Sequence, residues 1–182
     1  MIDKAILIKE LSSPIGKARV LELSRILKES FALRDLIDVT FHPDKDLAFR
    51  AAWILENVFL EDIESYEGDL NYLISRVPDV EHAGCQRHYA KILMHITAGN
   101  APPVIKEKLK GLDLEPVVEK CFDWLIAPNV KVAVKVSAAD ALFNIRERYP
   151  WIKEELSSQI RFLMRNGSAG MQHRGRKLLG IL

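Results

Sequence analysis

Three potential metal ligands, His82, Cys85 and His88, follow one another at intervals of three residues, and His95 comes seven residues after His88. Histidine nitrogen and cysteine sulfur both bind zinc. On a helix these side chains would lie roughly along one face. Zinc signatures use tighter spacing on loops, however, and the sequence contains no second cluster of such ligands. We therefore predict a cysteine in the core beside histidines on the surface, and no metal site.

Motifs for catalysis are missing from the sequence. It has no glycine-rich phosphate loop, no nucleophile elbow and no C-x-x-C pair. One acidic run lies near a predicted turn, where it is typical of a solvated surface; its members are Glu56, Glu61, Asp62, Glu64, Glu67 and Asp69. We assign no catalytic residue and no cofactor, and we expect a protein that is not an enzyme.

The elements that must position these side chains are predicted to be helices. Apolar residues recur at helical spacing along nearly the whole chain, and runs typical of strands are close to absent. Short breaks interrupt this pattern where helices should end. They occur at Pro14, Pro43, Pro78, residues 99–103, Pro128, Pro150 and residues 166–167. Gly167 is predicted to end its helix in a left-handed conformation.

The helices are predicted to form pairs. Four segments, which begin at Ala52, Ala90, Ala139 and Arg176, share a leucine at the fourth place and an aliphatic residue at the seventh. Their starts are 38, 49 and 37 residues apart, close to the period of about 40–47 residues of some two-helix repeats. Partner helices are predicted over 31–41, 70–77, 116–126 and 150–165, a cap over 2–11 and 15–27, and an extra helix over 103–112. An irregular helical bundle with accidental similarity is the alternative.

Residues 44–55 and 129–142 resemble the HEAT-like (armadillo-type) α-helical repeat family. Both have a turn with a small polar residue, then a basic residue and an alanine-rich second helix. The resemblance covers roughly residues 30–182, and it weakens in the last unit, where Arg176 replaces a small residue. It implies an all-α fold, a right-handed α-α superhelix of about four helical hairpins, in a single domain over 1–182 with capping helices over 1–29. It also implies a scaffold or partner-binding protein, although a minority of the family are DNA-base glycosylases.

In HEAT-like solenoids the second helices line the concave surface, which is a common binding surface. Positions that face away from the core on these helices therefore define a predicted ridge. Its members are Arg50, Trp53, Asn57, His88, Lys91, His95, Asp140, Asn144, Arg174 and Lys177. Trp and Arg are favoured at protein interfaces. The alternatives are that Trp53 packs against a neighbouring helix and that the charged members form a solvated face.

A basic patch without any acidic residue lies near the C-terminus. It consists of Arg161, Arg165, His173, Arg174, Arg176 and Lys177. Such a patch could bind phosphates by releasing counterions, or it could favour a helix C-terminus electrostatically and solubilise the end of the stack. A base-excision site would also need an aromatic ring and a carboxylate in one cleft. Trp53 and Asp140 match in type only, because they lie two units apart.

The bulk composition is that of a soluble globular protein. Of the 182 residues, 48% are hydrophobic and 28% are charged, and the net charge is +1. Residues 1–80 carry a net charge of −5 and residues 81–182 one of +6, a difference that could separate two partner surfaces or reflect solvated helix faces. Two cysteines imply no disulfide framework. Early charges interrupt any signal peptide and the longest uncharged run is broken by prolines, so we expect a cytoplasmic protein away from membranes.

The leading hypothesis is a non-catalytic module that binds another protein or a peptide on the predicted ridge. The alternative is a nucleic-acid-binding or DNA-base-excision protein that uses the basic C-terminal half. A third possibility is a structural subunit of a homo-oligomer, and the sequence leaves the oligomeric state open.

Overall fold

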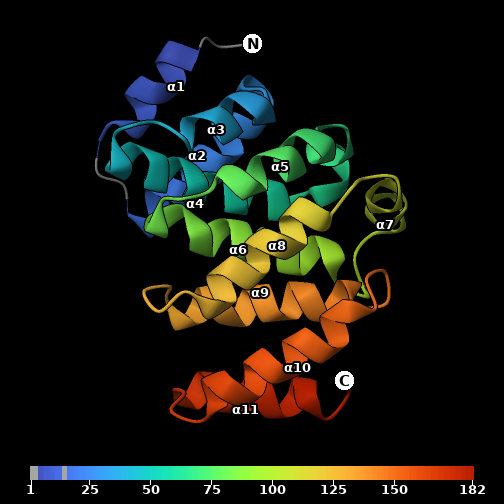
Figure 1. Cartoon of the computed structure of the whole chain (residues 1–182). Helices are drawn as coiled ribbons and strands as arrows, with labels where there is room; N and C mark the ends of the chain where they lie inside the picture. Colours follow the sequence, from blue (N-terminus) through green and yellow to red (C-terminus); the bar gives the residue numbers. More distant parts are fainter. Residues whose placement is uncertain (1–3, 14–15) are drawn as a thin grey trace.

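The computed structural model describes residues 4–13 and 16–182, and in these residues it contains only helices (Figure 1). The all-α fold predicted from the sequence is confirmed. The starts of the two capping segments, Ile2 and Ile15, lie outside the described residues. In chain order the elements are α1 (Lys4–Leu11), α2 (Lys17–Ser30), α3 (Leu33–Val39), α4 (Lys45–Glu61), η1 (Ile63–Asp69), α5 (Leu70–Arg76), η2 (Val77–Asp79), α6 (Ala83–Thr97), α7 (Pro103–Lys110), α8 (Glu115–Ile126), α9 (Val132–Ile145), α10 (Trp151–Met164) and α11 (Ala169–Leu179).

The helices form a stack of pairs that runs from the N-terminus at the top of Figure 1 to the C-terminus at the bottom. The second helices α2, α4, α6, α9 and α11 pack one against the next, and we call them the second-helix layer. The first helices α3, α8 and α10 pack on α4, α9 and α11. A single pair cannot bury both of its faces, so the stacking of neighbours creates one continuous core.

Small residues let the second helices approach one another. Ala52, Ala90 and Ala139 lie within α4, α6 and α9, and each is fully buried. The leucines at the fourth place of these three segments, Leu55, Leu93 and Leu142, are buried as well, and Leu179 in the last segment is half-buried. In the last unit Arg176, which stands at the place of these alanines, is exposed.

Side-chain caps fix the starts of two helices, α4 and α11. The side chain of Asp44 accepts hydrogen bonds from the backbone N–H groups of Asp46 and Leu47 and caps α4. These bonds hold the pKa of Asp44 below its usual value. Ser168 caps α11 by accepting from the N–H of Met171.

The prediction that Gly167 ends its helix in a left-handed conformation is wrong, because no described glycine has a positive φ. The turn between α10 and α11 needs glycine for another reason. A Cβ atom at Gly167 would lie 2.5 Å from the backbone oxygen of Leu163. Close approach of two backbone segments, rather than handedness, therefore selects glycine at this position.

The insertion predicted over 103–112 is the helix α7, which packs against η1 and α6. The short helix η1 carries three of the six residues of the acidic run, Glu64, Glu67 and Asp69. No described helix is both long enough and apolar enough to cross a membrane.

Candidate functional site

The predicted ridge lies on the second-helix layer, but its members have different environments. Trp53, Asn57 and Lys91 are half-buried, and His95 and Lys177 are exposed. Arg50, Asn144 and Arg174 are half-buried and bonded to neighbouring helices. His88 and Asp140 are buried. The ridge is therefore partly an open surface and partly a set of links between helices.

Glu56 is the centre of one such link, between α4 and α6. Its Oε2 atom lies 2.7 Å from Nδ1 of His88, and its Oε1 atom lies 2.5 Å from Nζ of Lys91. A carboxylate only accepts hydrogen bonds, so Nδ1 of His88 carries the proton that it donates. Burial alone would raise the pKa of Glu56, but the bonds from His88 and Lys91 outweigh it and hold that pKa below its usual value.

Two sequence-based predictions are wrong at this link. Glu56 was expected in a solvated acidic surface, yet it is only 8% exposed. His88 was expected on the surface, yet it is buried with Glu56. The signal in the sequence was the spacing of 32 and 35 residues from Glu56 to His88 and Lys91, close to one repeat. This spacing places an acid on one second helix opposite two bases on the next.

A second link joins α9 to α11. Nε of Arg174 donates to Oδ1 of Asp140 over 2.5 Å. Burial nevertheless raises the pKa of Asp140, and the hydrogen bond and the charge of Arg174 only partly offset this effect. Because Arg174 is bonded to Asp140 of the same chain, we no longer include it in the basic patch.

Two further links use backbone acceptors. The amide of Asn144 on α9 donates to the carbonyl oxygen of Met94 and to Oγ1 of Thr97 at the end of α6. The guanidinium of Arg50 on α4 donates to the carbonyl oxygens of Leu11 and Ser12 at the end of α1. These bonds satisfy polar groups at helix C-termini and set the positions of the helices that carry the open part of the ridge.

Replacing Glu56 with glutamine is expected to lower the free energy of unfolding at neutral pH by about 1–3 kcal/mol, because hydrogen bonds to a charged group are lost. A carboxylate whose folded pKa is depressed stabilises the fold above its unfolded pKa, and this contribution disappears as the pH falls through the folded value. The difference between wild type and E56Q should therefore be full at pH 7 and shrink below the ordinary glutamate value of 4.5. Urea unfolding from pH 7 to about pH 3 measures it.

Glu64 provides the control for this experiment, because it is exposed and forms no ion pair with a described residue. Glu64→Gln should change stability little at any pH. A difference between wild type and E56Q that stays constant down to about pH 3 would show that the Glu56 carboxylate does not carry the link.

An open groove of about 300 Å³ lies on the second-helix layer between α2, α4 and α6. Two ridge residues, Asn57 and Lys91, line it. One wall comes from α2, whose pairing with α4 depends on the tertiary structure and was not predicted; it consists of Leu21, Ser24 and Arg25. The remaining lining residues, Glu56, Leu60 and Glu61, lie on α4.

Two ridge aromatics lie on the same layer. His95 is exposed one turn beyond Lys91, and its pKa is lowered by partial burial and then by the charge of Lys91. The ring of Trp53 is half-buried, with its centroid 6.0 Å from that of Phe49. Trp53 thus packs on Phe49 of its own helix and still keeps part of its surface open.

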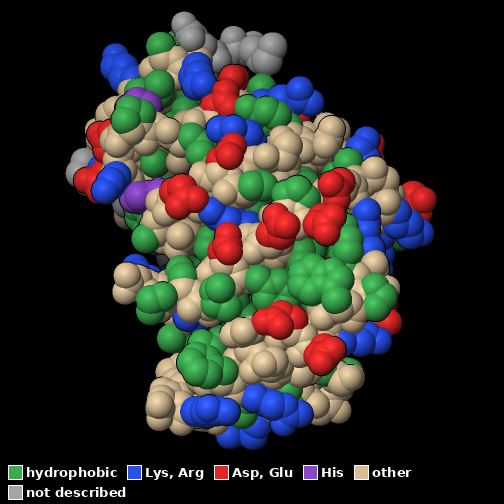
Figure 2. Space-filling view, in the orientation of Figure 1, with side chains coloured by type: hydrophobic (Ala, Val, Ile, Leu, Met, Phe, Trp, Pro, Cys, Tyr) green, Lys and Arg blue, Asp and Glu red, His purple; other side chains and the backbone are tan. Residues whose placement is uncertain are grey.

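The basic patch gathers at the C-terminal end of the stack, where blue side chains cover the bottom of the molecule in Figure 2. Arg161, Arg165, His173, Arg176 and Lys177 are exposed on α10 and α11. The guanidinium of Arg165 lies 6.0 Å from the ring centroid of Phe162.

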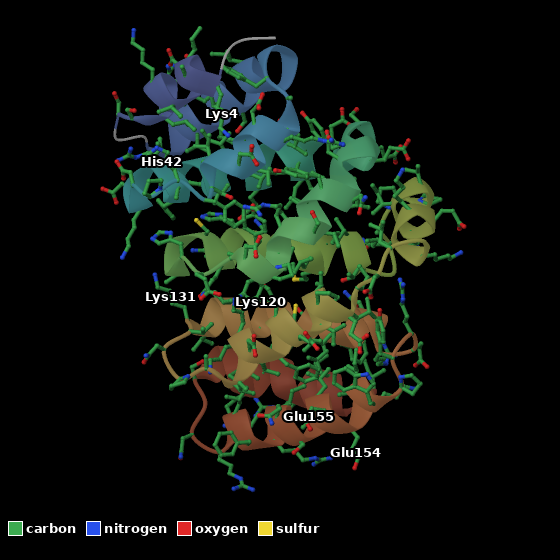
Figure 3. All side chains as sticks on the ribbon, turned by 45° about the horizontal axis from the view of Figure 1, so that its top comes forward. Lys4, His42, Lys120, Lys131, Glu154 and Glu155 are labelled. Atoms are coloured by element: carbon green, nitrogen blue, oxygen red, sulfur yellow. The ribbon has the colours of Figure 1, made fainter. Side chains whose placement is uncertain are left out.

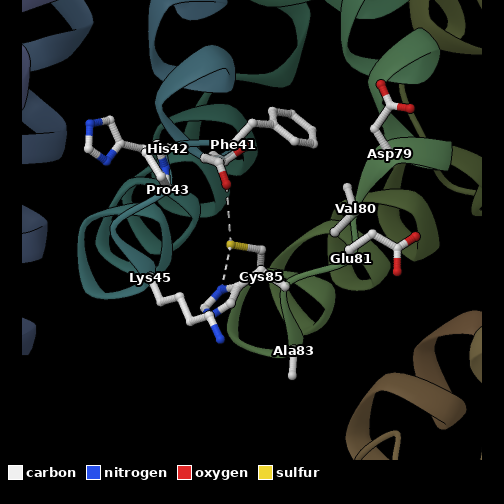
Figure 4. A pocket seen from close by; sticks show the side chains of 11 residues that line it. Phe41, His42, Pro43, Lys45, Asp79, Val80, Glu81, Ala83 and Cys85 are labelled. Atoms are coloured by element: carbon white, nitrogen blue, oxygen red, sulfur yellow. Dashed lines mark hydrogen bonds between the residues drawn. The ribbon is translucent and has the colours of Figure 1, made fainter.

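A larger pocket of about 610 Å³ lies between the turn before α4 and the turn before α6 (Figure 4). Cys85 lines it, with its sulfur 3.3 Å from Nδ1 of His82 and 3.6 Å from the carbonyl oxygen of Thr40. Burial raises the pKa of Cys85 to about 12, so the thiol is not ionised at neutral pH and is a poor nucleophile. The prediction of a core cysteine is confirmed. Among the described residues no three His, Cys, Asp or Glu side chains are placed to share a metal ion.

Comparison with known proteins agrees with this architecture. A family model described as a HEAT repeat domain matches residues 7–180. Neither the curated proteins nor the solved structures contain a match to the chain.

Proposed function

We propose that this chain, which belongs to the HEAT repeat family, is a non-catalytic module that holds a segment of another protein on its second-helix layer. HEAT repeats generally mediate protein interactions or scaffolding, and the surface of a helical solenoid is extended enough to bind a length of chain. The groove between α2, α4 and α6 is the observation that carries the proposal.

The lining of the groove fits a peptide better than a polyanion. Leu21 and Leu60 supply an apolar surface, Arg25 supplies positive charge and Glu61 supplies negative charge, while the charge of Lys91 is paired with that of Glu56. Apolar contacts with a few placed polar groups are typical of sites that bind side chains. Nucleic acid instead requires a positively charged surface, and carboxylates in the groove oppose it.

The residues of the predicted ridge accordingly fall into two groups, those that contact the partner and those that position the helices. We assign direct contact to Asn57 and Lys91, which line the groove, and to Trp53 and His95, which lie one turn away from them on the same helices and are half-buried or exposed. Lys177 is exposed on the last helix of the same layer and would extend this surface. The other ridge residues, Arg50, His88, Asp140, Asn144 and Arg174, position the helices through the links described above.

A double variant, Leu21→Glu with Asn57→Arg, is expected to lose the partner while the protein stays folded. Leu21 is 45% exposed, so a charge there removes apolar contact with little effect on stability. Asn57→Arg narrows the groove from the α4 side. Affinity capture with quantitative mass spectrometry should show one protein that wild type enriches at least about tenfold over the variant, which corresponds to about 1.4 kcal/mol of binding free energy.

Val104→Glu is the matched control, because Val104 is an exposed apolar residue on α7, away from the groove. It should capture the same protein as wild type. Equal capture by wild type and by the groove variant would contradict the proposal. The proposal would also be contradicted if the protein bound DNA or RNA with an affinity that falls steeply as the salt concentration rises. That dependence indicates phosphate contacts at the basic patch.

A further inference from the structure

Helix α10 presents an unusual stripe to solvent on the first-helix side of the stack. Seven exposed residues recur at intervals of three or four and therefore share one face of the helix. We call them the α10 stripe; they are Trp151, Glu154, Glu155, Ser158, Arg161, Phe162 and Arg165. Trp151 is 46% exposed and Phe162 is 63% exposed. Figure 3 shows Glu154 and Glu155 on this helix.

The stripe changes character at its middle. Before Ser158 it carries two carboxylates and an indole ring, and after Ser158 it carries two guanidinium groups and a phenyl ring. A two-fold rotation about an axis through Ser158 therefore brings the carboxylates to the end of the stripe that held the guanidinium groups. A surface of this kind is complementary to itself, which is the requirement of a two-fold interface, where every contact occurs twice.

We infer that the α10 stripe is the interface of a homodimer in which the two copies of α10 lie antiparallel and cross at Ser158. Helical geometry then sets Glu154 opposite the partner's Arg161 and Trp151 opposite the partner's Arg165. The first contact is an ion pair, and the second places a guanidinium on an indole face. Serine at the crossing point leaves room for close approach of the two helices.

A groove beside the stripe supports this arrangement. It measures about 440 Å³ and lies between α8 and α10. The rings of Phe122 and Trp151 stack there with their centroids 5.4 Å apart, and the exposed Ile126 adds to the apolar surface. Glu155 lies on the edge of the stripe that borders this groove, and it faces the position of the partner's Phe162. The phenyl ring of the partner's Phe162 therefore lies at the mouth of the groove.

The charge of the groove selects a basic occupant. Its carboxylates, Glu119, Asp123 and Glu155, form no ion pair with any described residue. In Figure 2 acidic side chains lie among hydrophobic ones on this face, and basic ones lie at its lower end. The partner's Arg165, which lies opposite Trp151 in this groove, supplies positive charge there, and the partner's Arg161 pairs with Glu154 on the other edge of the stripe. A second copy therefore supplies opposite charges to both the acidic and the basic half of the stripe, whereas a basic peptide would supply them only to the acidic half.

Mass measurement by light scattering after gel filtration tests the inference, with protein at about 5 to 500 µM to cover weak association. The mass of wild type should rise from 20.7 kDa toward twice that value as the concentration increases. Glu154→Arg and Arg161→Glu each set like charges opposite one another twice, so each should weaken association at least about tenfold. The double variant Glu154→Arg with Arg161→Glu exchanges the two charges and should dimerise again, a rescue that mere loss of surface solubility would not produce.

Lys108→Glu is the control for these charge reversals, because Lys108 is exposed on α7 and forms no ion pair with a described residue. It should dimerise as wild type does. Wild type that stays monomeric throughout would overturn the inference, even if it bound a basic peptide. A dimer that survives both single reversals would overturn it as well.

A disulfide cross-link tests the crossing point separately. Cysteine at Ser158 should give a covalent dimer on oxidation, because the two Cα atoms would lie within the roughly 4.4–6.8 Å that a disulfide spans. Lys108→Cys should not. The native Cys85 and Cys121 are buried, and burial raises the pKa of each to about 12, so they do not compete. Equal cross-linking at positions 158 and 108 would contradict the antiparallel arrangement.

Discussion

Replacing Trp124 with alanine is expected to lower the free energy of unfolding by about 3–5 kcal/mol, the range for loss of a large aromatic side chain from a core. Trp124 lies on α8 and is among the largest fully buried side chains of the described chain. Its indole nitrogen is buried without a hydrogen-bond partner among the described residues. Trp124→Phe keeps much of the apolar volume and removes that nitrogen, so it should cost much less. Urea unfolding at neutral pH measures both differences.

Trp151→Ala is the control for this prediction, because Trp151 is exposed and only stacks on Phe122. At low protein concentration it should cost no more than about 1.5 kcal/mol, the upper range for an aromatic pair. Equal losses at Trp124 and Trp151 would mean that α8 does not pack its indole into the core as described. The same W151A protein should show weakened self-association at high concentration, so one variant separates stability from assembly.

Ala139→Leu is expected to lower the free energy of unfolding by about 1–3 kcal/mol through overpacking. Ala139 is fully buried on α9, which packs against both α6 and α8. Interiors are close-packed, so the three added carbon atoms must displace neighbours or separate the helices. For a chain of this size the loss corresponds to roughly 2–4 °C in melting temperature for each kcal/mol, which thermal unfolding followed by circular dichroism detects.

Ala133→Leu is the matched control, because Ala133 is exposed on the same helix. Alanine and leucine have similar helix propensities, so this change should stay within about 0.5 kcal/mol. If the two substitutions had equal effects, alanine would not be needed where the second helices meet.

The link residues and the open part of the ridge have different roles in binding. Glu56 lines the groove between α2, α4 and α6 and also accepts from His88 and Lys91. Its replacement would therefore disturb the shape of the groove as well as its charge. Leu21 and Asn57 are better probes of binding, because neither bonds to another second helix.

The sequence by itself determined the α-helices, the recurrence of the second helices α4, α6 and α9, and the buried alanines. These features depend on local physics: apolar residues at helical spacing define a buried face, prolines and glycines interrupt it, and a small residue recurs where two backbones come close. Ala52, Ala90 and Ala139 were identified from that recurrence, and all three are buried on successive second helices. Cys85 was predicted in the core for a different reason, because its spacing from the histidines does not fit a zinc site, and it is buried.

Only the tertiary structure decided which polar residues face solvent. His88 and Asp140 occupy positions that point away from the core of their own pair, and each is nevertheless buried against a neighbouring second helix. Such a contact joins residues more than 30 positions apart, and its register depends on how side chains interdigitate between two helices. Helical periodicity describes one helix at a time. It therefore located the ridge but could not separate the residues that link helices from those that remain open to a partner.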